Sequence, residues 1–285
     1  MILVTGATGQ LGRLVIQQLL MNVPATQIVA AVRSPEKASD LAALGVVVRK
    51  ADYSDPATLA SALEGVDKVL LISSNELGQR FTQHSAVIDA AKAAGVKLLA
   101  YTSVLHADTS LLALAEEHRQ TEDYLRKSGV PFALLRNGWY HENYAASVPS
   151  ALAHGAHFGS AGTGRISSAA RADYAGAAAA VLTSSDSQAG KVYELAGDDA
   201  YTLSDFAALI AKQSGQPVVY TDLPEAEFKG ALLGAGLPEE FAELLANSDA
   251  AAAKGALFDD SRQLSTLIGR GTAPLSASVA AALPK

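Results

Sequence analysis

The chain has 285 residues, of which 49% are hydrophobic and 18% charged, and its formal net charge is −7. This composition is typical of a globular protein, either one large domain or a domain with a smaller lobe, and not of a disordered chain. The negative charge without a dense Lys/Arg run argues against a nucleic-acid partner, and the lack of cysteine excludes disulfides, thiolate metal sites and cysteine nucleophiles.

Strand and helix patterns alternate through the first half of the chain. Runs of Val, Leu, Ile and Ala predict buried strands at residues 1–6, 27–33, 46–52, 67–74, 97–103 and 131–137. Helices are predicted between them, at residues 10–21, 35–45, 55–66, 79–96 and 111–130. Continuous apolar strands separated by helices indicate a parallel sheet covered on both faces. With right-handed crossovers this is an α/β fold, a Rossmann-type doubly wound parallel sheet.

After about residue 140 the pattern becomes less regular. A Gly-rich stretch predicts loops and short strands, and further helices and strands follow it; the segments are residues 154–167, 171–184, 191–197, 202–215, 216–223, 224–236 and 261–270. We therefore expect a first domain, the Rossmann-type sheet with its helices, over residues 1–140. Residues 141–285 are expected to form a smaller C-terminal α/β lobe that binds substrate and partly returns to the sheet.

The first strand runs into VTGATGQLG, in which Gly6, Gly9 and Gly12 are each separated by two residues. Glycine permits a tight turn and a close backbone approach, and the N-terminus of the following helix offers N–H groups and positive potential to a pyrophosphate. A purely structural turn is the alternative. Because the motif stands between a predicted strand and a predicted helix, we predict that it binds a dinucleotide.

The end of the second strand carries Arg33, 21 residues after Gly12, where an acidic residue would favour NAD. A guanidinium suits a 2′-phosphate, so we predict NADPH as the cofactor and weaker binding of NADH; a solvated arginine is the alternative. Ser73, Ser74 and Asn75 end the fourth strand and face the same crevice by topology. Ordinary turn chemistry is the alternative for these three residues.

Polar and aromatic residues follow the sixth strand in NGWYHENY, residues 137–144. Trp139 and Tyr140 are predicted to stack on a ring, or else to pack against the second lobe. Asn143 and Tyr144 are expected deeper in the same pocket. Further along, Arg171 is expected either to reach a cofactor phosphate or to pair with Asp173.

Together these segments resemble the NmrA-like group of atypical short-chain dehydrogenase/reductases. The similarity rests on VTGATGQLG, Arg33, ADYSD, LISS, YTSVLHAD and LLRNGWYHENY and on the later KVYELAGD and KGALFDDS, and it spans essentially the whole chain. Within the family the chain most resembles the quinone-reducing members, and the triphenylmethane reductases less closely. The resemblance implies an NADPH-dependent, flavin-free, two-electron reduction of quinones to hydroquinones. Its implied cofactor contacts are Gly6, Ala7, Thr8, Gly9, Gln10, Leu11, Arg33, Ser73, Ser74, Asn75, Asn137, Gly138, Trp139, Tyr140, His141 and Glu142.

Most short-chain reductases carry a Tyr-x-x-x-Lys pair, whose positions the resemblance assigns here to Leu114 and His118. Helical spacing places His118 on the inward stripe, where it would touch cofactor or substrate, or else pair with Glu122. Glu122 itself is expected to be structural, paired with Arg136. A hydroquinone anion is delocalised, so positioning and modest hydrogen bonding could supply most of the catalysis. The expected catalytic residues are His118, Asn137, Tyr140 and Asn143.

The remaining expectations concern alternatives, partners and location. An NmrA-like redox sensor that binds NADP(H) and a protein partner is one rival function, and a reductase of other conjugated electrophiles such as dyes is another. We expect no flavin, metal or membrane partner, because no metal-ligand spacing and no segment of about 18 to 20 apolar residues occurs. A cytoplasmic location is expected, since no signal peptide is recognisable. The physiological quinone, the proton donor and homo-oligomerisation stay open.

Overall fold

The computed structural model describes residues 1–284 and divides them into two compact units. Unit 1 consists of Met1–Ala107, Glu117–Asn137 and Ala172–Tyr193. Unit 2 consists of Asp108–Glu116, Gly138–Arg171 and the described residues from Glu194 onward. Each unit is therefore assembled from segments that are far apart in the sequence.

A seven-stranded sheet forms the centre of unit 1, with the strand order β3-β2-β1-β4-β5-β6-β8. The pairs β1–β2, β1–β4, β2–β3, β4–β5 and β5–β6 are all parallel. The strands are β1 (Ile2–Val4), β2 (Ile28–Val32), β3 (Val47–Lys50), β4 (Lys68–Leu71), β5 (Leu98–Val104), β6 (Phe132–Asn137) and β8 (Lys191–Leu195). This topology confirms the predicted Rossmann-type doubly wound sheet.

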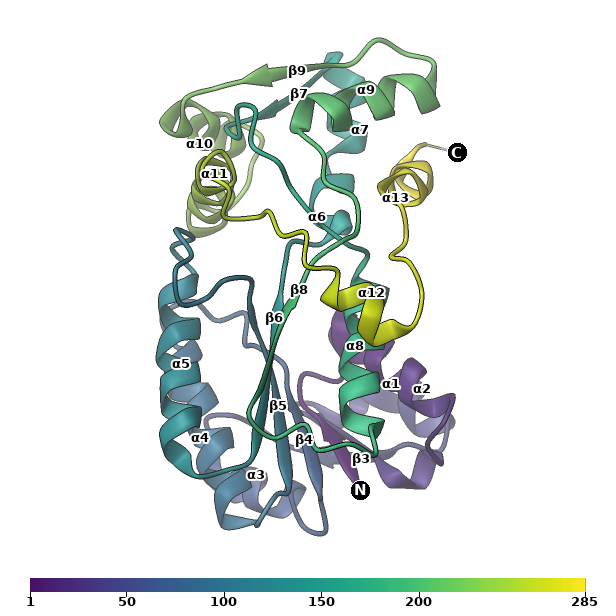
Figure 1. Cartoon of the computed structure of the whole chain (residues 1–285), viewed down its shortest axis with the longest axis vertical. Coiled ribbons are helices and arrows are strands. Elements are labelled where there is room, and N and C mark those ends of the chain that lie inside the picture. Colours follow the sequence, from purple (N-terminus) through teal and green to yellow (C-terminus); the bar gives the residue numbers. More distant parts are fainter. Residues whose placement is uncertain (285) are drawn as a thin grey trace. The chain divides into compact units, whose positions relative to one another are not determined.

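Helices cover both faces of this sheet. Figure 1 shows α3 (Pro56–Ala62), α4 (Arg80–Ala93) and α5 (Ala115–Ser128) on one face, and α1 (Gln10–Leu20), α2 (Ser39–Ala43) and α8 (Arg171–Thr183) on the other. Every residue of β2 and of β5 is buried, as expected for strands covered on both sides. One core cluster joins Leu3, Val69 and Leu99 of the strands to Ile88 of α4 and Leu125 of α5.

Local signals explain where some of these helices begin. Asp55 caps α3 by accepting a hydrogen bond from the N–H of Ala57 at 3.2 Å, and Pro56 occupies the first helical position. The single helix predicted over residues 35–45 is wrong. The segment forms a short 3-10 helix, η2 (Pro35–Ala38), and then α2, because Ala38 adopts φ −114° and ψ 19° between them. Ala38 is fully buried, so its packing outweighs helix continuity here.

Unit 2 is mainly helical around a small two-stranded parallel sheet of β7 (Ala156–Gly159) and β9 (Val219–Asp222). The predicted segment at residues 202–215 forms the helix α9 (Leu203–Ser214). Thr202 Oγ1 accepts from the N–H of Asp205, whose carboxylate accepts from the N–H of Thr202. The other helices are α6 (His141–Ala145), α7 (Val148–His154), α10 (Glu225–Gly234), α11 (Glu239–Ala252), α12 (Gln263–Ile268) and α13 (Leu275–Ala282). A further 3-10 helix, η1 (Ala25–Gln27), precedes β2 in unit 1.

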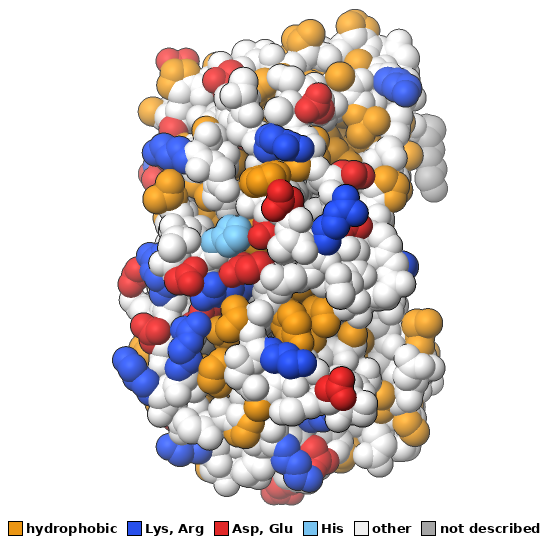
Figure 2. Space-filling view, viewed as in Figure 1, with side chains coloured by type: hydrophobic (Ala, Val, Ile, Leu, Met, Phe, Trp, Pro, Cys, Tyr) orange, Lys and Arg blue, Asp and Glu red, His pale blue; other side chains and the backbone are white. Residues whose placement is uncertain are grey.

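The surface carries charges of both signs. On the face drawn in Figure 2, Lys and Arg side chains are interspersed with Asp and Glu side chains. Among residues 1–284, no helix combines the length and the apolar character that a membrane crossing requires.

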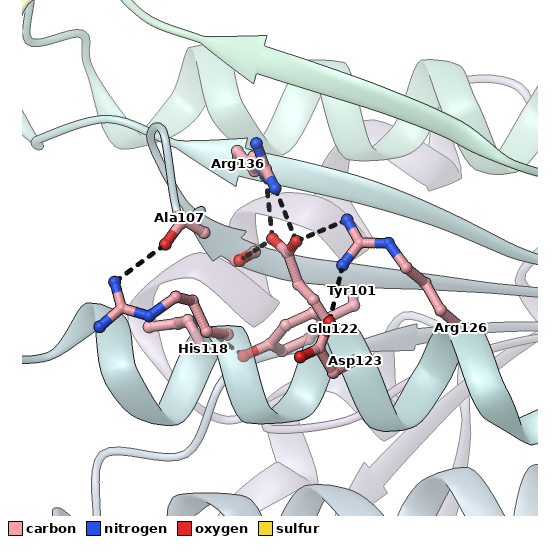
Figure 3. Close-up of polar contacts among 9 residues, drawn as sticks. Tyr101, Ala107, His118, Glu122, Asp123, Arg126 and Arg136 are labelled. Carbon is pink, nitrogen blue, oxygen red and sulfur yellow. Dashed lines mark hydrogen bonds and ion pairs between the residues drawn. The ribbon is translucent and has the colours of Figure 1, made fainter. Parts of the chain in front are cut away.

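A buried ionic network joins α5 to strands β5 and β6 of unit 1. The carboxylate of Glu122 accepts hydrogen bonds from Arg136 Nε at 3.0 Å and Nη2 at 2.7 Å, which confirms the predicted pair. Ser103 Oγ donates to it at 2.6 Å and Arg126 Nη2 at 2.9 Å. Figure 3 shows Arg126 and Arg136 pointing toward Glu122. Glu122 is 1% exposed and Arg136 is 4% exposed, so the ion pair is buried. Because both groups are removed from water, each charge stabilises the other.

Replacing Glu122 by alanine is expected to lower the free energy of unfolding by about 3 to 5 kcal/mol, because it leaves the Arg136 guanidinium buried without its carboxylate. Asp123→Ala is the matched control: Asp123 is the next residue, is exposed, and pairs with Arg126 at 3.5 Å. That change should cost less than about 1 kcal/mol. Urea denaturation followed by far-UV circular dichroism measures both values, and equal losses would contradict the assignment of the buried pair.

Candidate functional site

The glycine-rich turn places the N-terminus of α1 at the carboxyl end of β1. Gly6 adopts φ +56°, and the N–H of Gly9 donates to the Gly6 carbonyl at 2.9 Å. A Cβ on Gly12 would lie 2.4 Å from that carbonyl oxygen and 2.8 Å from the Cα of Ala7. Helix and turn are therefore packed too closely for any side chain at position 12.

The start of α1 is suited to bind an anion. Within the described chain, no side chain caps its first N–H groups, and its first turn contains no acidic residue. The positive end of the helix dipole thus stands without a competing negative group from its own turn. This is the arrangement in which a Rossmann protein holds a pyrophosphate.

Hydrogen bonds between neighbouring strand ends fix the loop that follows β4. Thr5 Oγ1 accepts from the N–H of Ile72 at 2.9 Å, and Thr102 Oγ1 accepts from the N–H of Ser73 at 2.9 Å. Residues 73–75 therefore lie beside the turn after β1, where the strand order of the sheet reverses. This reversal marks the usual ligand crevice of such sheets.

Arg33 lies just beyond the end of β2 and is exposed, with 71% of its side chain accessible. Its Nη1 donates to Glu76 Oε1 at 3.0 Å, and Glu76 Oε2 accepts from Gln83 Nε2 at 2.6 Å. Arg13, another cation near the turn, is engaged by Asp40 and by the carbonyl oxygens of Thr8 and Lys37. Sequence reasoning identified Arg33 but missed Glu76, because nothing local in the sequence indicates that the loop after β4 reaches it.

His84 positions the loop after β4 through a hydrogen bond. Its Nε2 accepts from the N–H of Ser74 at 2.9 Å, so its Nδ1 carries the proton and donates to Thr121 Oγ1 at 3.0 Å. Burial, and then the positive charge of Arg80, lower the pKa of His84 to about 3. Arg80 Nε donates to the carbonyl of Ser74 at 2.8 Å, so both side chains position the same loop.

His118 faces the interior of unit 1, as its helical spacing predicts. It is 5% exposed, and its Nδ1 lies 2.7 Å from the hydroxyl of Tyr101, which is fully buried in β5 (Figure 3). Burial, and then the positive charge of Arg80, lower the pKa of His118 well below its ordinary value, so the imidazole is neutral. Its partner is thus Tyr101, whereas the carboxylate of Glu122 is engaged by Ser103, Arg126 and Arg136.

Asn137 ends β6 and is 6% exposed. Its Oδ1 is buried and has no hydrogen-bond partner among residues 1–284. A buried amide oxygen without a partner is uncommon and costs free energy unless a bound group satisfies it. Within unit 1, this residue is thus suited to accept a hydrogen bond from a ligand at the carboxyl edge of the sheet.

The rest of the NGWYHENY segment belongs to unit 2. Glu142 accepts from the N–H of Arg171 at 3.0 and 3.1 Å, and the Arg171 guanidinium lies 3.9 Å from the same carboxylate. That guanidinium also stands 4.7 Å from the centre of the Tyr140 ring. The sequence predicted a cofactor phosphate or Asp173 as the partner of Arg171. The structure adds Glu142 and Tyr140, which are distant from Arg171 in the sequence.

A cavity of about 160 Å³ lies within unit 2. Trp139, Asn143 and Tyr144 contribute to its wall, so three residues expected in one pocket do share a cavity. Sequence reasoning missed the opposite wall, which α10, α11 and β7 supply through Phe228, Leu232, Leu245, His157, Phe158 and Asp249. These residues carry no motif, and only the tertiary fold brings them together.

Burial strongly shifts the pKa of three titratable groups in this cavity wall, Tyr144, His157 and Asp249. Tyr144 donates its hydroxyl hydrogen to Asp249 Oδ1 at 3.0 Å, and the N–H of Ser160 donates to Asp249 Oδ2 at 3.0 Å. Burial nevertheless raises the pKa of Asp249 to about 6 and lowers the pKa of His157 to about 4. Across residues 1–284, no cluster of three or more His, Asp or Glu side chains has the arrangement of a metal site.

The reversed strand order, the glycine turn at α1 and the guanidinium beyond β2 are those of a dinucleotide-binding Rossmann protein. The chain belongs to the NmrA-like family, whose model matches residues 1–281. The resemblance inferred from the sequence is thereby confirmed.

Individual relatives agree with this family. The chain is 60% identical to Quinone oxidoreductase 2 of Escherichia coli over 279 residues, which are 98% of this chain and 97% of the relative. The crystal structure of the NADPH-dependent quinone oxidoreductase from Escherichia coli complexed with NADPH matches with a TM-score of 0.97 over 99% of both chains. The triphenylmethane reductase of Citrobacter sp. complexed with NADP(H) is 41% identical, with a TM-score of 0.96 over 99% of this chain and 100% of that one.

The buried histidines predict that acid weakens the fold. Unfolded histidines bind protons below about pH 6.5, whereas His84, with a pKa of about 3, and His118 stay neutral in the folded chain. The free energy of unfolding should therefore fall as the pH decreases from about 6.5 towards 4. Asp249 acts in the opposite direction, since its raised pKa gives stability that is lost as the pH rises through about 6. Because two buried histidines act against one aspartate, the net result is that the free energy of unfolding falls as the pH decreases.

Urea denaturation at a series of pH values measures this slope. His84→Gln should reduce the number of protons taken up on unfolding by about one, because one of the titrating groups has been removed. His154→Gln is the control, since His154 is exposed and donates only to its own helix. An unchanged slope in His84→Gln would show that His84 does not carry the effect.

Proposed function

We propose that this chain is an NADPH-dependent quinone oxidoreductase that acts in the cytoplasm and uses neither flavin nor metal. The observation that carries the proposal is the 60% identity, over almost the entire length, with Quinone oxidoreductase 2 of Escherichia coli, a protein solved with NADPH. The local geometry supports the same cofactor, because the turn after β1 suits the pyrophosphate and Arg33 the 2′-phosphate of such a dinucleotide.

The proposed cofactor contacts in unit 1 are the backbone of residues 6–11, Arg33, Ser73–Asn75 and Asn137. Gly12 keeps the turn bare of side chains, and the N-terminus of α1 offers N–H groups to a pyrophosphate. Asn137 brings the unsatisfied buried oxygen described above, which an amide N–H group would satisfy. In unit 2, we propose that Gly138–Glu142 and Arg171 complete the contacts. The bound nicotinamide supplies a hydride.

The cavity of unit 2 is the proposed quinone pocket. Trp139 and Phe228 give it aromatic walls, and Leu232 and Leu245 give it aliphatic ones, which suits a flat and largely apolar ring. The Asn143 amide offers a donor for a quinone oxygen. Tyr140 and His118 complete the proposed catalytic residues, and His118 acts as a neutral imidazole because it is buried against Tyr101.

Reduction of triphenylmethane dyes is the second candidate function. A triphenylmethane reductase shares 41% of its sequence with this chain and the same fold at a TM-score of 0.96. Both reactions deliver a hydride to an extended conjugated acceptor, so the size and shape of the pocket decide between them.

Steady-state assays test the proposal directly. The purified protein should oxidise NADPH in the presence of simple benzoquinones, at a rate well above that with triphenylmethane dyes. Asn143→Ala should lower kcat/KM for quinones by about tenfold, since it removes one hydrogen bond of about 1 to 1.5 kcal/mol. Tight NADPH binding without turnover of any quinone would instead favour the sensor function.

Arg33→Ala is expected to weaken NADPH binding by about 10- to 100-fold, the value of one charge-assisted hydrogen-bonded pair. NADH, which lacks the 2′-phosphate, should be affected less than about twofold. Lys212→Ala is the control, because Lys212 is an exposed cation on α9 in unit 2. Isothermal titration calorimetry measures all of these constants, and equal losses for the two coenzymes would reject the 2′-phosphate role.

A further inference from the structure

The guanidinium of Arg33, which is proposed to bind the 2′-phosphate, already forms an ion pair with a carboxylate. Glu76 Oε1 accepts from Arg33 Nη1 at 3.0 Å, although the two residues follow different strands, β4 and β2. These strands flank β1 on its two sides, so the ion pair lies across the turn after β1. The pair therefore joins both sides of the crevice in unit 1.

Glu76 is held in place by more than this ion pair. Its Oε2 accepts from Gln83 Nε2 at 2.6 Å, and Gln83 is 7% exposed on α4. The N–H of Glu76 donates to Ser74 Oγ at 3.1 Å, within the loop proposed to contact the cofactor. Both carboxylate oxygens are thus directed by neighbours, and the negative charge stays beside Arg33.

The two coenzymes meet this pair differently. A 2′-phosphate carries nearly two negative charges and needs the guanidinium donors that Glu76 now uses. A ribose 2′-hydroxyl has no negative charge and can donate a hydrogen bond to a carboxylate, which is how acidic residues favour NAD in related folds. The same carboxylate therefore disfavours NADPH and favours NADH.

We propose that Glu76 is a specificity-determining residue: it competes with the 2′-phosphate for Arg33, limits the affinity for NADPH and keeps NADH usable. This inference rests on the proposed NADPH-dependent function. Through Glu76, Arg33 is neutralised before the cofactor arrives, and the pair re-forms when NADP⁺ leaves. Oxidised cofactor is released more readily as a result.

The expected change in NADPH affinity follows from how exposed the Arg33 and Glu76 side chains are. The side chains of Arg33 and Glu76 are 71% and 45% accessible, so water and salt screen their attraction. Such a pair is easily displaced by a phosphate, which has twice the charge. Removing the carboxylate should then tighten NADPH binding by about three- to tenfold, a much smaller change than the loss expected for Arg33→Ala.

The test is Glu76→Gln, which removes the charge and keeps the size of the side chain. Calorimetry at low salt should show NADPH, NADP⁺ and the fragment 2′,5′-ADP all binding about three- to tenfold more tightly than to the wild type. NADH should bind no more tightly. The gain for NADPH should shrink at about 0.5 M salt, because the effect is electrostatic. Glu36→Gln is the matched control, since Glu36 is an exposed acid three residues after Arg33.

A double variant tests whether Glu76 acts through Arg33. In an Arg33→Ala background, Glu76→Gln should change NADPH affinity by less than about twofold, since the competition has been removed. The inference is overturned if Glu76→Gln weakens NADPH, if it tightens both coenzymes equally, if Glu36→Gln has the same effect, or if the gain persists without Arg33. Failure of the wild type to bind NADPH would reject the proposed function instead, and a thermal melt confirms that each variant is folded.

Discussion

The contact between Gly12 and the carbonyl of Gly6 is the constraint on which the rest of unit 1 depends. With no Cβ at position 12, α1 packs directly on the turn after β1 and starts at the carboxyl end of the sheet. Any side chain there would overlap the backbone, and the helix N-terminus would have to move away from the crevice. The placement of residues 73–75 and of Arg33 matters for function because this bare, positive helix end lies between them.

The other strand ends are held by buried polar groups. A neutral His84 accepts from the loop after β4, and the Arg80 cation beside it helps to keep it neutral. Glu122 and Arg136 form a buried ion pair that ties β6 to α5. Asn137 follows Arg136 directly, so a structural ion pair positions a residue with an unsatisfied oxygen.

The sequence was most informative where a local pattern determines the structure. Apolar runs predict six strands of the sheet, and the glycine spacing predicts the turn. It failed where tertiary packing overrides local preference, as at Ala38, whose burial splits a predicted helix. Glu76 and Asp249 were missed for a different reason. Their partners, Arg33 and Tyr144, are 43 and 105 residues away, and no spacing rule reports such pairs.

The absence of the Tyr-x-x-x-Lys pair agrees with the chemistry of a quinone. At the position that the resemblance gives to the lysine, His118 is buried, neutral and hydrogen-bonded to Tyr101, so it brings no positive charge to stabilise an alkoxide. Ketone reduction would suffer, because an alkoxide concentrates its charge on one oxygen and needs a strong donor. Hydride transfer to a quinone gives an aromatic anion with delocalised charge, for which orientation of the two rings contributes most. A buried histidine in place of the lysine is therefore compatible with the proposed reaction and unfavourable for the alcohol chemistry of most short-chain reductases.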